Sequence, residues 1–185
     1  MTSQRRRALA VVALGALALT GCTGGAQDDV PHDAPSGGQT LEEVQVSLDS
    51  LPGIHVSEIA GGGRPNVKGN TGYAVALEVE PGYTVSDGAA LVDFVVTSVW
   101  SVREGYQPNA RVDISVRTPA GEDFDVVAAA AEAGWVKDTG AAPSAYGTVP
   151  VEVSASSRQG ARNLERLGSW PGAVPEAPEG VTTEG

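Results

Sequence analysis

Apolar and polar residues alternate cleanly along two stretches of the chain, residues 73–80 and 111–117. A period of two is typical of a strand that buries one face and leaves the other in water. A third strand is expected over 54–60. A fourth is expected over 149–153, and Pro150 marks it as an edge strand because proline cannot donate a ladder hydrogen bond. The pattern therefore predicts one small sheet of about four strands.

Two other stretches, residues 40–51 and 87–103, repeat apolar residues every three or four positions, which predicts helices. Two shorter helices are expected over 123–133 and 157–167, from the residues at their starts and from Gly134 and Gly168 after their ends. Each begins where side chains able to cap a helix stand. These caps are Thr40 with Glu43, Ser86 or Asp87, the acidic residues from Asp123, and Ser157.

The expected order is helix, strand, strand, helix, strand, helix, strand, helix. Because the strands alternate, their second face stays polar, so the helices should cover one face only. We therefore expect an α+β, two-layer sandwich with one small mixed or antiparallel sheet of about four strands. The domain should span residues 40–170, preceded by a flexible linker over 22–39 and followed by a Pro/Gly/Glu-rich tail, 171–185, that we expect to be disordered.

The N-terminus has the pattern of an export signal. Arg5, Arg6 and Arg7 precede a twelve-residue apolar run from Ala8 to Leu19. That run is shorter than the roughly 20 residues that a membrane-spanning helix needs. Residues 1–21 are therefore expected to be a signal peptide, which is removed.

Leu19-Thr20-Gly21-Cys22 follows this run and resembles the lipobox of bacterial lipoproteins. The resemblance implies that the thiol of Cys22 receives a diacylglycerol and that the mature chain begins at Cys22, carrying acyl chains such as palmitate. Two or more acyl chains make a stable anchor. The protein would then be held at the outer, extracytoplasmic side of the cell membrane. A buried core thiol or a disulfide is the alternative, but Cys22 is the only cysteine and has no partner within the chain.

The element order from Thr40 to Thr118, together with Leu51-Pro52-Gly53-Ile54, is similar to that of BON domains, small modules of bacterial envelope proteins. Loss of the signal leaves nine basic residues against 23 acidic ones, a net charge of −14. Such a charge disfavours nucleic acid as a partner and also disfavours lying flat on anionic lipid, because both are negative. Ten arginines against two lysines, with abundant Ala, Gly and Val, are typical of high-GC bacteria such as actinobacteria.

Candidate catalytic residues are sparse. His55 and Ser57 share a strand face, and so do Glu78 and Glu80, about 7 Å apart along a strand. Neither pair has the surrounding motif of a hydrolase, so we expect ordinary surface residues and no enzyme. An envelope hydrolase using surface carboxylates is the alternative.

Two further patterns suggest ligands, but each has a simpler interpretation. Asp28, Asp29, His32 and Asp33 could ligate a metal, yet they lie in the expected linker. The glycine-rich loop 61–72 lacks the ending of a phosphate-binding loop and should join two strands. No metal and no cofactor are therefore expected.

Arg158, Arg162 and Arg166 are spaced by four and should form one stripe on the last helix. This stripe could bind an envelope protein or an anionic polymer. The simpler interpretation, which we favour, is that it neutralises an acidic body from within the molecule. We expect a membrane-anchored binding or interaction module of the cell envelope; a purely structural lipoprotein is a further alternative.

Overall fold

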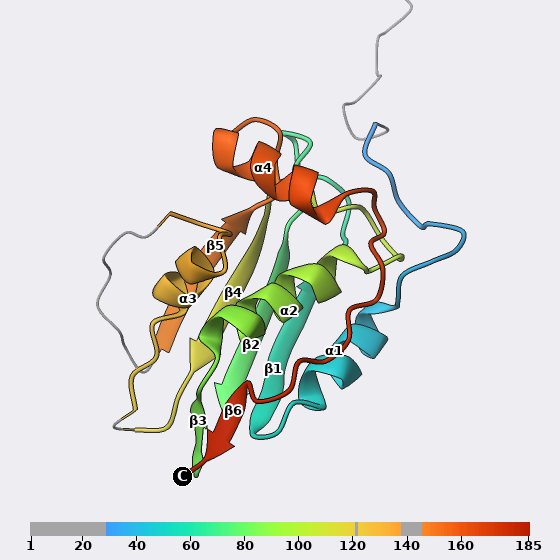
Figure 1. The fold of residues 1–185 in the computed structure, drawn as a ribbon. Coiled ribbons are helices and arrows are strands. Elements are labelled where there is room, and N and C mark those ends of the chain that lie inside the picture. Colours follow the sequence, from blue (N-terminus) through green and yellow to red (C-terminus); the bar gives the residue numbers. More distant parts are fainter. Residues whose placement is uncertain (1–28, 121, 138–145) are drawn as a thin grey trace, which may run out of the picture.

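The computed structural model describes residues 29–120, 122–137 and 146–185. The expected signal peptide and Cys22 lie outside these residues. The fold is α+β, as predicted: a mixed four-stranded sheet carries helices on one face (Figure 1). A second, two-stranded sheet stands beside it.

The main sheet has the strand order β1-β2-β4-β5, which places β1 and β5 at its edges. β2 pairs antiparallel with β1 and parallel with β4, and β4 pairs antiparallel with β5. Every second residue of β2 and β4 is buried, as their alternation predicts. The strands are β1 (Ile54–Gly61), β2 (Tyr73–Val79), β4 (Arg111–Arg117) and β5 (Tyr146–Glu152).

All four predicted helices form, and side chains cap their starts. Thr40 and Glu43 make the predicted capping box. Asp87, rather than Ser86, caps α2, and Ser157 caps α4. α3 begins at Val126, three residues after the predicted start, because Asp125 is its cap. The helices are α1 (Leu41–Asp49), α2 (Gly88–Trp100), α3 (Val126–Glu132) and α4 (Arg158–Leu167).

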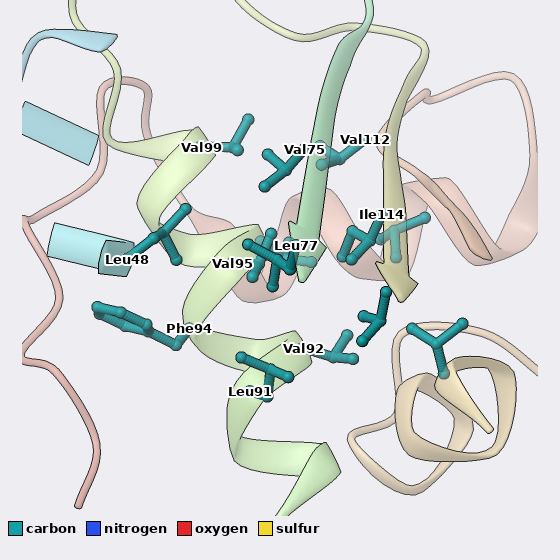
Figure 2. Close-up of a cluster of buried hydrophobic side chains, with 14 of the residues drawn as sticks. Leu48, Val75, Leu77, Leu91, Val92, Phe94, Val95, Val99, Val112 and Ile114 are labelled. Carbon is teal, nitrogen blue, oxygen red and sulfur yellow. The ribbon is translucent and has the colours of Figure 1, made fainter. Parts of the chain in front are cut away.

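The core lies between α2 and the sheet. Figure 2 shows Leu91, Val95 and Val99 of α2 pointing toward the side chains of β2 and β4. Burial of such aliphatic side chains contributes about 1.5–3 kcal/mol each, so this layer supplies most of the stabilisation. α2 is buried on its outer side as well, where Phe94 and Trp100 are almost inaccessible.

The C-terminal segment explains this outer burial and differs from the predicted disordered tail, 171–185. It runs over the helical layer to the small sheet, in which β6 (Thr182–Glu184) pairs antiparallel with β3 (Tyr83–Val85) (Figure 1). The amide of Gly172 donates to the carbonyl of Trp100, and Val181 is buried. A Pro/Gly/Glu-rich composition gave no sign of these contacts, because the residues that receive the segment are far away in sequence.

The predicted linker also differs from the structure over residues 29–39. Val30 and Gln39 are buried, and backbone hydrogen bonds join this stretch to residues 101–107. Among the described residues, the folded body therefore includes 30–39 and 171–185 as well as those of the predicted domain, 40–170. We call the end of the molecule where residues 29–39 pack the proximal end; it includes residues 29–43, 61–72, 101–111 and 152–167. The distal end comprises 49–54, 78–88, 117–120, 122–126 and 182–185.

Candidate functional site

The three arginines predicted to form a stripe are all exposed on α4, at the proximal end. Arg166 is engaged within the molecule. Its guanidinium forms an ion pair with Asp93 of α2, donates to the carbonyl of Ala133 at 2.6 Å, and lies 3.9 Å from the ring centre of Trp135. Arg166 therefore fastens α4 to α2 and α3.

Asp93 is the centre of this contact. One of its oxygens accepts from the guanidinium of Arg166 and also from the indole N–H of Trp135, at 3.1 Å. Trp135 is completely buried and packs against the core. No local sequence pattern links Asp93 to Arg166, because 73 residues separate them.

Arg158 and Arg162 remain available to a partner. The guanidinium of Arg162 donates to the side chain of Gln159. Within the described residues, neither arginine forms an ion pair with a carboxylate. The stripe is thus divided: one arginine neutralises an internal acid, and two carry uncompensated charge.

A polar groove of about 650 Å³ opens beside the turn that precedes α4. Its walls come from the loop before β2, the start of β4, the end of β5 and the turn before α4, and they present amides, hydroxyls and charges of both signs. The groove lies within the size range of ligand sites, although such sites are usually more apolar. Among the residues that line it are Asn66, Lys68, Asn70, Arg111, Asp113, Glu152, Ser154 and Ser156.

Several of these polar groups are fixed by hydrogen bonds. The guanidinium of Arg111 donates to Asp113 at 2.9 Å. The carboxylate of Glu152 accepts from the hydroxyl of Ser157, the cap of α4. The side chain of Lys68 has no such partner in the described part of the chain. It is therefore the free cation of the groove.

The loop that carries Lys68 is held in place by two asparagines. The side-chain oxygen of Asn66 accepts from the amides of Lys68 and Asn70, at 2.8 and 3.2 Å. Asn109 accepts from the amide of Thr71 and donates to the carbonyl of Gly69, at 2.7 and 2.8 Å. A loop ordered in this way loses little conformational entropy when it binds a ligand.

A second hollow, of about 400 Å³, lies on the other side of this loop. It shares Lys68, Asn70, Ser154 and Ser156 with the groove, and Val30 also lines it. The chain thus joins the folded body next to the groove. The sequence does not predict that Val30 lies beside Lys68, because its composition indicates a flexible linker over residues 22–39.

The candidate catalytic residues lie outside the polar groove. None of His55, Ser57, Glu78 and Glu80 lines the groove or the hollow beside it. His55 lies 3.4 Å from Asp49, and Glu78 lies 3.3 Å from Arg117. The hydroxyl of Ser57 donates to a backbone carbonyl.

The acidic cluster of the predicted linker also has a structural role. The carboxylate of Asp33 accepts from the amide of Gly105 and from His32, and these hydrogen bonds hold its pKa below the usual value. Asp28 lies outside the described residues. Within them, no group of three or more His, Cys, Asp or Glu side chains is placed to hold a metal ion.

Among the described helices, none has the length and apolar character needed to span a bilayer. Comparison with protein-family models, curated proteins and solved structures found no match to this chain.

Proposed function

We propose that this chain is a lipid-anchored, extracytoplasmic binding module of a bacterial cell envelope. The anchor is Cys22, as the resemblance of Leu19-Thr20-Gly21-Cys22 to a lipobox implies. The ligand site is the polar groove. The observation that carries this proposal is the convergence of polar side chains from four separate segments around an open groove beside a fixed loop.

The chemistry of the groove indicates the class of ligand. Amide and hydroxyl groups alternate there with Lys68, Arg111, Asp113 and Glu152, so donors, acceptors and both signs of charge are available. Such a site suits a polar, extended ligand, such as an envelope peptide or glycan, better than an apolar small molecule. A binding role also fits the engagement of His55, Ser57 and Glu78 with other groups of the protein.

Site-specific photo-crosslinking in intact cells tests this proposal. A photoreactive amino acid replaces Ser156 in the groove or, as a control, Val46, which is 66% exposed on α1. We expect a discrete adduct from position 156 that position 46 does not give and that Arg111→Ala weakens. The same set of adducts from both positions, or no adduct from position 156, would contradict a ligand site in the groove.

A further inference from the structure

The loop between β1 and β2 carries at its tip an exposed apolar residue, which is followed by a cation without an ion-pair partner. Val67 is 97% exposed, the highest value among the large apolar side chains of the described residues, and Lys68 follows it. The side chain of Asn66, which precedes Val67, accepts from the amides of Lys68 and Asn70, which follow it. An exposed valine beside a cation suits the boundary between lipid headgroups and acyl chains.

The path of the chain keeps this loop near the anchor. Val30 and Lys68 line the same hollow. Seven peptide steps separate Cys22 from Asp29, the first described residue. At about 3.3–3.6 Å for each step, these residues span at most about 25 Å. The proximal end therefore lies close to the bilayer whenever Cys22 is acylated.

Charge is distributed unevenly between the two ends. Seven of the nine basic residues that follow Cys22 lie in the proximal segments, together with seven carboxylates, two of which are Glu42 and Glu43 in the first turn of α1. The distal segments hold eight carboxylates against the single Arg117. An anionic membrane therefore repels the distal end much more strongly than the proximal one.

We infer that the proximal end docks on the membrane, with Val67 at the headgroup boundary and with Lys68, Arg158 and Arg162 on anionic phospholipid headgroups. This inference rests on the proposed lipid anchor and adds a second, electrostatic contact to it. Ser154 and Ser156, in the turn before α4, line the same hollows as Lys68, so the start of α4 lies next to the loop. The groove then opens beside the membrane.

A single fluorescent label tests the docking. Once Cys22 is acylated, Val67→Cys supplies the only free thiol, and an environment-sensitive dye attached there reports on lipid contact. Val46→Cys is the matched control on α1. The full lipidated protein is reconstituted in vesicles of phosphatidylcholine alone or with phosphatidylglycerol, and flotation of the same vesicles measures anchoring.

With phosphatidylglycerol we expect a blue shift, and quenching by spin-labelled lipids, at position 67 but not at position 46. Each Lys or Arg near an anionic surface is worth about fivefold in binding. Lys68→Gln/Arg158→Gln/Arg162→Gln should therefore lower the ratio of docked to free domain about 100-fold while flotation persists.

Equal signals at positions 67 and 46, or a signal at position 67 that does not depend on lipid charge, would overturn the docking and leave the anchor standing. A shift of the same size with soluble dextran sulfate would also overturn it, because the surface would then recognise anionic polymers in general. Loss of flotation would overturn the anchor itself, and the docking with it.

Discussion

Arg166 is the residue that ties α4 to the rest of the molecule. We predict that Arg166→Ala lowers the free energy of unfolding by about 1–2 kcal/mol, because a cation–π contact and an ion pair are lost together. The lower value, about 1 kcal/mol, takes account of screening by solvent, because both side chains of the ion pair are more than 40% exposed. Urea unfolding followed by circular dichroism measures the change.

Arg162→Ala is the matched control, since it removes an exposed arginine from the same helix without breaking an ion pair. Its effect should stay within about 0.5 kcal/mol. Arg166→Lys keeps the charge but loses the planar stacking on Trp135, so it should restore only part of the stability. Equal effects of Arg166→Ala and Arg162→Ala would show that the contact with Asp93 contributes nothing.

Tyr73 makes stability depend on pH in the alkaline range. Burial, together with the nearby carboxylates of Glu104 and Asp33, raises the pKa of Tyr73 to about 12. The folded protein therefore keeps the phenolic proton after the unfolded chain has lost it. The stabilisation is complete below pH 10 and is lost between pH 10 and about 12. It amounts to about 2 kcal/mol.

Tyr73→Phe should remove this part of the pH dependence. It should also cost about 1 kcal/mol at neutral pH, because the hydroxyl no longer donates to the carbonyl of Tyr106. Urea titrations at intervals between pH 8 and 12 compare the two proteins. Parallel stability curves for both would show that Tyr73 does not titrate in this range.

At the scale of the elements, the C-terminal segment is the feature most open to a direct test. Val181 is 2% exposed, and its carbonyl accepts from the amides of Ser86 and Asp87. Val181→Ala should destabilise the fold by about 1–2 kcal/mol. It should also speed amide hydrogen exchange in β3 and β6.

Val174→Ala serves as the control in the same segment, because Val174 is 50% exposed. It should change stability by less than about 0.5 kcal/mol. Exchange in β3 and β6 that is as fast in the unmodified protein as in Val181→Ala would mean that the segment does not stay on the body.

The elements of the main sheet were predictable because each carries its own local signal. Period-two alternation marked β2 and β4, Pro150 marked an edge strand, and the capping side chains of α1 and α4 marked helix starts. β3 and β6 have three residues each, too few to show a period. Their pairing, and the docking of residues 29–39, depend on distant contacts that no local pattern reveals.

In the candidate site, too, some features follow from local sequence patterns and others depend on distant contacts. The spacing of Arg158, Arg162 and Arg166 predicted a common helix face, which the structure has. It could not show that Asp93 binds only the last of them. The groove was not predictable, because the segments that carry Lys68, Arg111 and Ser154 are brought together only by the sheet. The two asparagines on either side of Lys68, Asn66 and Asn70, are the sign in the sequence of an ordered loop.

At the scale of the whole molecule, the distribution of charge and the path of the chain both favour the proximal end as the end that faces the membrane. The net charge of the chain after Cys22 is strongly negative, which alone disfavours contact with an anionic membrane. The uneven distribution weakens this objection, because most of the basic residues stand at the end where the chain enters the body and the excess of carboxylates lies elsewhere. We therefore propose that the anchor, the groove and the basic surface act together at the proximal end of the protein.

Mass spectrometry of the N-terminal peptide, recovered from membranes of cells that express the full chain, tests that proposal most directly. We expect a peptide that begins at Cys22 and carries a diacylglycerol on its thiol. Cys22→Ala should abolish this modification and release the protein from the membrane fraction. An unmodified Cys22 or cleavage at another position would contradict the proposed anchor, as would equal membrane retention of Cys22→Ala.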